Sequence, residues 1–578
     1  MVAFANTLRS SLKYSARRRE CREPPQAECS QGRGGGQKEK ESTSIHRIIH
    51  HRRRFRPKLC LDLDSYPRDW DRTRGIMCTR AESGTAALTA GRIASDPGVP
   101  YVVRPFLPSC GQALLRYIST RGRAPVLDFA DVLLAGLADD GGLYVPETWP
   151  TIGPAEIASY AGRTYAQAAA DIMARFTEPA ISRQELAPLV EAAYAGFGHP
   201  AIAPLRQLDS GEWLLELFHG PTLSFKDYAL QVLGQLFDHV LKRRKRHVTV
   251  VGATSGDTGS AAIEACRDRD AITAFILHPK GRITDVQRRQ MTTVPSPNVH
   301  NIAIEGTFDD CQALVKQMFG DLEFRERMRL TAVNSINWAR VMAQVVYYFT
   351  AAAALGAPAR VPAFAVPTGN FGDAFAGHVA RRMGLAIPQM VIATNRNDIL
   401  VRLLESGTYR KGPVLSSISP SIDIQVSSNF ERLLLELEGN DPGAVRQRMT
   451  EMDQGGQFRI SDTALARMRA QFDGRGVNEE ETLRCIADVQ QRCGIIIDPH
   501  TAVGIVAGRA KRRQRDVPMV YLSTAHAAKF PDAVQQASGM EAPLPVRLAD
   551  LYEREERFDV LPNDFRTVKA YVEQRAAA

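Results

Sequence analysis

Short apolar runs rich in β-branched residues alternate with amphipathic stretches along most of this chain. The stretches 227–243 and 308–322 repeat their apolar positions every three to four residues, which predicts helices. Such alternation is typical of an α/β protein whose parallel-rich sheets are covered by helices on both faces. Ligands of these folds bind at the carboxyl ends of strands, so we expect the chemistry in the loops that follow them. Strands are predicted at residues 213–218, 247–253, 271–277, 299–305, 361–367, 389–394 and 517–523.

The regular pattern begins near residue 115, and the segment before it has a different composition. Residues 1–114 contain 21 basic and 11 acidic residues, whereas the remainder of the chain contains 52 and 53. The net charge of +9 therefore belongs to the first segment and not to the body of the chain. Because that segment has few large apolar residues, we predict a disordered basic extension, or upstream sequence read from a start assigned too early. In the second case Leu115 is the initiator position.

Composition also narrows the partners and the compartment. The arginine clusters of the extension lack interleaved aromatic residues, so we expect no nucleic-acid partner. No apolar run approaches about 18 residues, so no membrane partner is expected, and residues 341–359 predict a buried core helix instead. Five of the nine cysteines precede residue 115, and the other four lack metal-ligand spacing. We therefore expect a cytoplasmic protein with free thiols and no metal site.

The stretch HGPTLSFKDYAL (219–230) places a lysine where the first predicted strand gives way to a helix. A lysine at the start of a helix is most often exposed to solvent. A buried lysine has a lowered pKa, and its neutral amine can form a Schiff base with a carbonyl. Lys226 alone does not decide between these interpretations.

Two glycine-rich loops follow two other predicted strands. TSGDTGSAA (254–262) turns into a helix whose free N–H groups suit an anion, and it is not a Walker A loop because no Gly-Lys-Ser/Thr follows. In TGNFGDAFAG (368–377), Gly369 and Gly372 let the backbone bend so that successive N–H groups converge on a phosphate. Each loop alone is also compatible with an ordinary turn.

The last predicted strand ends in TAHAAKF (524–530), where the hydroxyl of Thr524 can reach a ring nitrogen. His526, taken alone, is more often a structural histidine. Together the four loops supply a lysine for a Schiff base, a cradle for a cofactor phosphate, a cradle for a substrate carboxylate and a hydroxyl for a heterocycle. This combination indicates a pyridoxal phosphate site, in which the protein positions the cofactor and tunes its electronics.

Seven stretches carry a resemblance to a known family: YISTRG, DGGLYVP, HGPTLSFKD, ATSGDTG, NSINWAR, PTGNFGD and STAHAAKF. From residue 115 to about 535 the chain resembles the threonine synthase family, in the longer form found in many bacteria and in fungi. The resemblance implies the α/β fold type II architecture of pyridoxal phosphate enzymes, similar to the tryptophan synthase β subunit. The family usually has proline where this chain has Ala527, and the first 114 residues have no counterpart in it.

By this resemblance Lys226 is the catalytic residue that binds pyridoxal 5'-phosphate covalently. The glycine-rich loop after the fifth predicted strand is implied to hold the cofactor phosphate, and Thr524 to face the pyridine nitrogen. The implied cofactor-binding residues are Lys226, Gly369, Asn370, Phe371, Gly372, Asp373 and Thr524.

The resemblance further implies conversion of O-phospho-L-homoserine and water to L-threonine and phosphate, the last step of threonine biosynthesis. The substrate carries a carboxylate and a phosphate, so two anion sites are needed besides the cofactor cradle. TSGDTG suits the carboxylate. The side chain of Asp257 would repel an anion, so it also suits a role in orienting the loop. For the phosphate we favour NSINWAR (334–340), with Asn337 and Arg340 on one helix face, over Lys280 or Arg282. The implied substrate-binding residues are Ser255, Asp257, Thr258, Ser335, Asn337, Arg340 and Arg282.

The expected domain organisation combines the predicted elements with this resemblance. We expect an N-terminal, mostly helical domain at 115–205 and a small domain at 246–355. The large cofactor-binding domain is expected to comprise 206–245 and 356–578, with a family-specific insertion around 406–492 that covers the site. A monomer or a homodimer is expected.

Two alternative functions remain open from the sequence. A lyase that converts phosphohomoserine to 2-oxobutyrate requires the same lysine and the same cradles. It differs only in how water reacts with the intermediate. A nucleic-acid-binding protein acting through the basic extension is the more remote alternative, because every expected catalytic position of the body is filled.

Overall fold

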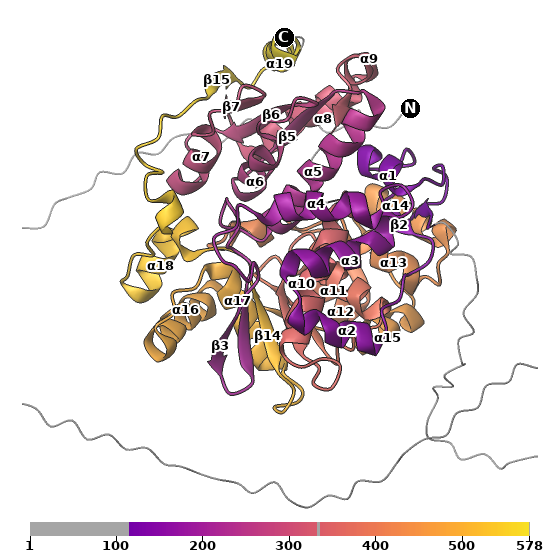
Figure 1. Ribbon diagram of the computed structural model, residues 1–578, viewed down its shortest axis with the longest axis vertical. Helices are drawn as coiled ribbons and strands as arrows, with labels where there is room; N and C mark the ends of the chain where they lie inside the picture. The colour runs from indigo at the N-terminus through magenta and orange to yellow at the C-terminus, as the bar shows by residue number, and fades with distance from the viewer. Residues whose placement is uncertain (1–114, 332–335, 577–578) are drawn as a thin grey trace, which may run out of the picture. The chain divides into compact units, whose positions relative to one another are not determined.

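The computed structural model describes residues 115–331 and 336–576 (Figure 1). The predicted disordered extension, residues 1–114, lies outside the described residues, and so does Ser335. Two large sheets organise the described part of the chain, and in Figure 1 the strands β5, β6 and β7 lie above β3 and β14.

The first large sheet has six strands, all parallel to their neighbours except β3, which is antiparallel to β4. Its central strands β9, β10 and β14 are buried along their whole length, as expected for a sheet covered on both faces. In sheet order the strands are β13 (Phe472–Gly476), β10 (Met390–Thr394), β9 (Ala363–Pro367), β14 (Met519–Ser523), β4 (Glu212–Glu216) and β3 (Leu205–Asp209).

The second large sheet has five strands, all parallel. Two antiparallel pairs, β1 with β2 and β11 with β12, lie apart from both large sheets. In sheet order the second sheet is β15 (Asp559–Pro562), β7 (Val299–Glu305), β6 (Ile272–Pro279), β5 (Val248–Ala253) and β8 (Leu330–Thr331). The pairs are β1 (Tyr117–Ser119), β2 (Tyr144–Pro146), β11 (Thr408–Arg410) and β12 (Gln457–Arg459).

Helices cover the sheets and join them. The N-terminal helices are α1 (Phe129–Ala135), α2 (Pro154–Ser159), α3 (Tyr165–Thr177) and α4 (Arg183–Tyr194). With the second sheet lie α6 (Asp257–Cys266), α7 (Asp285–Thr292), α8 (Phe308–Gly320), α9 (Leu322–Arg327) and α19 (Phe565–Ala576). The others are α5 (Lys226–Arg244), α10 (Trp338–Ala354), α11 (Gly372–Arg382), α12 (Ile399–Ser406), α13 (Phe430–Leu437), α14 (Pro442–Gly455), α15 (Asp462–Gln471), α16 (Glu479–Cys493), α17 (Pro499–Lys511) and α18 (Pro531–Ser538). Short 3₁₀ turns are η1 (Tyr160–Gly162), η2 (Pro420–Ile422), η3 (Ala527–Lys529) and η4 (Val546–Leu548).

Helix α10 is the centre of the largest core. Its apolar residues fall on all sides, and all but two of its residues are buried, so it packs against α3, α5 and α11 at once. This confirms the buried core helix predicted from the apolar run 341–359. Helix α5 also packs against α6, and thereby connects the core around α10 with the second sheet. No helix among the described residues is long and apolar enough to cross a membrane.

The structure contains a strand at each of the seven predicted positions. It departs from the expected domain organisation at two places. Strand β15 pairs in register with β7, and α19 buries Val568 and Val572 in the core of the second sheet, so the end of 356–578 leaves the first sheet. Strand β13 lies inside the expected insertion, yet it forms the edge of the first sheet beside β10. The four cysteines of the described residues are free, as expected.

Candidate active site

The lysine loop connects β4 to α5 and ends with Lys226 as the first helical residue. The loop is fixed by Asp227, whose carboxylate accepts hydrogen bonds from the N–H of Thr222 at 2.8 Å and from its hydroxyl at 2.7 Å. The N–H of Phe225 donates to the carbonyl of Thr524 at 2.8 Å. The lysine loop and the end of β14 are therefore joined by backbone contacts.

Lys226 is buried, and its ammonium donates to Asp257 Oδ2 at 3.2 Å. Asp257, the first residue of α6, accepts three further contacts: Ser421 at 2.9 Å, Gln287 at 2.9 Å and Lys529 at 2.7 Å. We call these five residues the Asp257 cluster. Both oxygens of the buried carboxylate are thus satisfied, by two cations and two neutral donors.

The charges of the cluster shift the pKa of its members in opposite directions. Burial lowers the pKa of Lys226; Asp257 opposes this shift, and the neighbouring cations Lys529 and Arg340 reinforce it. Burial alone would raise the pKa of Asp257, but Lys529 and Lys226 hold it well below its ordinary value. The cluster therefore holds a permanent carboxylate beside an amine that gives up its proton more readily than an exposed lysine.

The second glycine-rich loop joins β9 to α11. Phe371, just before the helix, has a left-handed backbone with φ of 64°, which turns the chain sharply into the helix N-terminus. A side chain at Gly369 would come within 3.1 Å of the backbone of Ser421, and one at Gly372 within 3.2 Å of the Asn429 amide. The carbonyl of Asn370 accepts from the N–H of Asn429 at 3.1 Å. The segment 421–429 therefore packs closely on this cradle, and a side chain at Gly369 would press on its backbone.

Asp373, the second residue of α11, faces the protein interior. Its Oδ1 accepts hydrogen bonds from the hydroxyls of Tyr347 and of Tyr348, the latter at 2.9 Å, while Oδ2 has no partner among the described residues. Burial raises the pKa of Asp373 to about 6, although both tyrosines oppose the shift. In this structure its described contacts anchor the start of α11 on α10.

Arg340, on the first turn of α10, is 5% exposed. Its Nε and one terminal nitrogen have no hydrogen-bond partner among the described residues, and burial lowers its pKa to about 10. We expected Asn337 to share a helix face with it. Instead Asn337 is the N-cap of α10: its amide accepts from the N–H of Ala339 at 3.0 Å and donates to the carbonyl of Leu133 at 2.8 Å. Both amide atoms of Asn337 are therefore engaged in hydrogen bonds, whereas two N–H donor groups of Arg340 have no partner among the described residues.

The structure brings together four of the predicted loops but not every predicted residue. Ser421 joins the Asp257 cluster to the cradle at Gly369, and Thr524 is joined to the lysine loop. Ser255 is exposed and Thr258 half-buried at the N-terminus of α6. Arg282 is exposed on the loop after β6, and the structure does not bring it to the cluster.

Sequence reasoning missed several members of this site. Lys529 is fully buried on η3, and besides Asp257 its ammonium contacts the carbonyl of Thr222 at 2.7 Å. Ser421 is held in turn by His500, whose Nε2 accepts from its N–H at 3.1 Å. Lys529 lies in the motif STAHAAKF, so a second lysine beside the predicted ring-facing threonine was an available signal. No local pattern marked Ser421 or Gln287.

These residues fit pyridoxal phosphate. Arg340 is a buried cation with free donors, Lys226 is a buried amine with a lowered pKa, and the cradle presents a helix N-terminus whose first N–H groups lack intrahelical partners. The arrangement supplies an amine for a carbonyl, an anion site and a further cation for an anionic substrate.

Comparison with protein families gives the same assignment along most of the described chain. The model for the threonine synthase N terminus matches residues 116–194, the model for pyridoxal-phosphate dependent enzymes matches residues 199–520, and the model for the threonine synthase C-terminal region matches residues 501–572. The second of these spans more than half of the chain.

Individual relatives agree. The chain is 55% identical over 461 residues to the threonine synthase of Pseudomonas aeruginosa, covering 80% of this chain and 98% of the relative. A crystal structure of pyridoxal phosphate-bound threonine synthase from Brucella melitensis matches with a TM-score of 0.79 and 52% identity, covering 80% of this chain and all of that one. The yeast threonine synthase structure matches with a TM-score of 0.77 and 38% identity over 81% of this chain and all of that one. The chain belongs to the threonine synthase family of fold type II, pyridoxal phosphate-dependent enzymes.

Proposed function

We propose that this protein is a threonine synthase that converts O-phospho-L-homoserine and water to L-threonine and phosphate. The observation that carries the proposal is a buried lysine with a lowered pKa next to a buried arginine whose donors are free, in a chain of this family. The amine suits a pyridoxal phosphate enzyme, and the guanidinium suits a substrate that carries a phosphate.

Lys226 supplies the acid–base chemistry. When bound, pyridoxal phosphate acts as the electron sink that makes the hydrogens on the substrate's Cα and Cβ acidic. With substrate in the site, the free amine of Lys226 would take the proton from the substrate's Cα and later return it. Asp257 keeps this amine in place through the 3.2 Å contact, and its lowered pKa means that it remains a carboxylate.

Two anion sites orient the substrate. The Arg340 guanidinium binds the γ-phosphate and stabilises the charge of the leaving phosphate, because its buried position strengthens each charged hydrogen bond. The N-terminus of α6, with Ser255 and Thr258, binds the carboxylate through hydroxyl and N–H donors. Gly369–Gly372 hold the cofactor phosphate, and Thr524 offers its hydroxyl to the ring nitrogen.

The remaining expectations follow from this proposal. The partner is a small-molecule substrate; neither nucleic acid nor a membrane is required. We place the protein in the cytoplasm, as a monomer or a homodimer.

The test is to prepare the full chain and a chain starting at residue 115, record their visible spectra and identify the product formed from phosphohomoserine. An absorption band at about 410–420 nm, with threonine and phosphate formed in equal amounts, supports the proposal. Formation of 2-oxobutyrate makes the protein a lyase with the same cofactor. A colourless protein without product overturns the cofactor assignment.

A further inference from the structure

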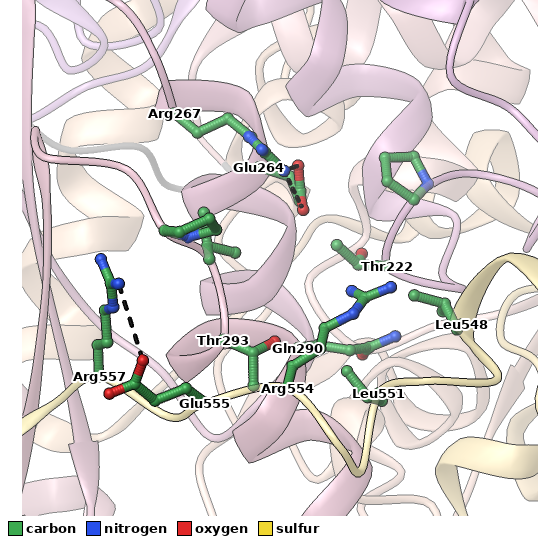
Figure 2. A pocket seen from close by; sticks show the side chains of 13 residues that line it. Thr222, Glu264, Arg267, Gln290, Thr293, Leu548, Leu551, Arg554, Glu555 and Arg557 are labelled. Carbon is green, nitrogen blue, oxygen red and sulfur yellow. Dashed lines mark hydrogen bonds and ion pairs between the residues drawn. The ribbon is translucent and has the colours of Figure 1, made fainter.

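A cavity of about 470 Å³ lies behind the lysine loop (Figure 2). Its walls come from the C-terminal halves of α6 and α7, from the chain segment 548–557 and from Pro221 and Thr222. None of the residues that we assign to the cofactor or the substrate lines it. Its size is in the range of small-molecule sites. Because it shares no lining residue with the assigned site, we treat it as a second cavity.

Gln290 on α7 is the unusual wall residue. It is 5% exposed, and neither its amide nitrogen nor its amide oxygen has a hydrogen-bond partner among the described residues. In Figure 2 the side chains of Gln290, Arg554 and Thr222 point toward the same space. A buried amide with both atoms unpaired costs free energy unless a ligand satisfies it, and an amide satisfies a donor and an acceptor together.

The wall that faces Gln290 is held in place and does not collapse onto it. The neighbouring Arg289 donates to the carbonyls of Leu551 and of Arg554, the latter at 3.2 Å. Arg288 binds Glu556 through two contacts of 2.8 and 3.1 Å. These contacts fix the segment 548–557 against helix α7. The segment therefore cannot move inward to fill the cavity.

The remaining walls carry charges of both signs and one apolar region. Glu264 on α6 and Arg267, just after the helix, form an ion pair at 3.2 Å, and Arg554, which is paired with Asp550 at 2.7 Å, lines another wall. Leu548 and Leu551 supply the apolar region. Walls of mixed sign disfavour a polyanion and suit a ligand that carries both an ammonium and a carboxylate, with an apolar remainder.

We propose that this cavity binds a free, electrically neutral α-amino acid with an apolar side chain, and that the bound amino acid modulates the Lys226 site. The carboxylate is bound by Arg554 and by the amide nitrogen of Gln290. The ammonium is bound by Glu264 and by the amide oxygen of Gln290. The side chain packs on Leu548 and Leu551.

The route to Lys226 is a short chain of contacts through Thr222. Thr222 lines the cavity, and its carbonyl accepts from Lys529 at 2.7 Å. Lys529 binds Asp257 at 2.7 Å, and Asp257 binds Lys226 at 3.2 Å. A ligand that displaces Thr222 changes the position of Lys529, and with it the charge next to Lys226. This modulation rests on the proposed function, whereas the binding does not.

Binding is tested by calorimetry on the full-length holoenzyme with L-leucine, 4-methylpentanoate and leucinol. We expect saturable binding of L-leucine, and binding weaker by about 10-fold or more for the analogues that lack the ammonium or the carboxylate. Gln290→Met should weaken L-leucine binding by a similar factor without loss of fold, and Gln317→Met, at an exposed glutamine of α8, should not. Equal binding of all three compounds, or no binding at millimolar concentration, overturns the proposal.

Modulation is tested by the visible spectrum of the same holoenzyme. We expect L-leucine to shift the cofactor band in the wild type and in Gln317→Met, but not in Gln290→Met. Because this readout needs no substrate, it stays valid if the reaction is not the one proposed. Binding without any spectral change in the wild type overturns the route through Thr222 and leaves the ligand site.

Discussion

The Asp257 cluster and the Arg340 guanidinium are both buried close to Lys226, but their charges are satisfied in different ways. Asp257 receives two lysines and two neutral donors from within the chain. Arg340 is equally buried, yet two of its nitrogens find no partner among the described residues. The charge of Asp257 is paired within the chain, whereas Arg340 keeps free donors, which the proposed function assigns to the substrate phosphate.

Substitutions in the two regions should therefore affect the stability of the fold in opposite directions. Removing one member of a satisfied buried cluster leaves an uncompensated charge and destabilises the fold. Removing an unpaired buried charge relieves a desolvation cost and stabilises the fold, at the expense of the ligand that the charge binds. The five changes below test this contrast in order of decreasing expected effect.

Lys226→Ala removes the amine that lies beside both Asp257 and Arg340. Turnover should fall by at least about 10⁴-fold, because the cofactor loses its covalent partner and the substrate loses its base. The visible band should disappear in the spectrum of the purified protein. Lys242→Ala is the matched control, since Lys242 lies on the same helix but is exposed, and its ion pairs with Asp238 and Asp270 lie at the surface. A coloured, active Lys226→Ala protein contradicts the site.

Lys529→Met breaks the satisfied cluster. Asp257 would keep a single cation in a buried position, so the free energy of unfolding should fall by about 3–5 kcal/mol. Thermal unfolding measures the loss. The double variant Lys529→Met with Asp257→Asn should recover part of it, because the neutral amide no longer needs a second cation. If the single variant is as stable as the wild type, Asp257 does not depend on Lys529.

Arg340→Met tests the unsatisfied region and should have two opposite effects. The unfolding free energy should rise by about 1 kcal/mol, since an unpaired buried cation is gone. At the same time kcat/KM for phosphohomoserine should fall about 100-fold through the loss of charged hydrogen bonds to phosphate. Arg282→Met, at an exposed position, should change neither quantity. The reverse result would assign the substrate phosphate to Arg282.

Asp373 provides the contrast to Asp257, because it is a buried carboxylate whose partners are two tyrosines, with no cation paired to it in the described part of the chain. Its pKa of about 6 lies above the ordinary 3.8, so the folded protein binds the proton more tightly than the unfolded chain. The unfolding free energy should therefore fall by about 2–3 kcal/mol as pH rises through this interval. Asp373→Asn should remove that part of the slope in unfolding experiments between these pH values. An unchanged slope would show that Asp373 does not titrate there.

Ala527→Pro concerns the position of Lys529 and has the smallest expected effect. Ala527 opens the turn η3, and the preceding His526 has an extended backbone with ψ of 138°, which proline tolerates in its neighbour. The change should leave kcat unaltered and raise the unfolding free energy by about 0.4–1 kcal/mol. A loss of activity would indicate that alanine is required for the geometry of Lys529.

Much of the fold could be predicted from local patterns. The seven apolar runs are strands because β-branched residues that are buried on both sides of a sheet leave an unambiguous signal. Strands β3, β13 and β15 were not predicted, since each lies at or near a sheet edge and has few buried residues. Their place is decided by the partner strand and not by their own sequence.

The sequence by itself determined the α/β alternation, the lysine after the first strand, the two glycine-rich loops and the family that these motifs indicate. Only the tertiary structure decided that Asp257 binds Lys226 and Lys529, that Ser421 reaches the same carboxylate from a segment 164 residues away, and that Arg340 is left with free donors. The physical reason is that hydrogen-bonded turns and apolar periodicity are local properties of the chain. Burial, pairing of charges and the resulting pKa shifts depend on which distant segments fold against each other.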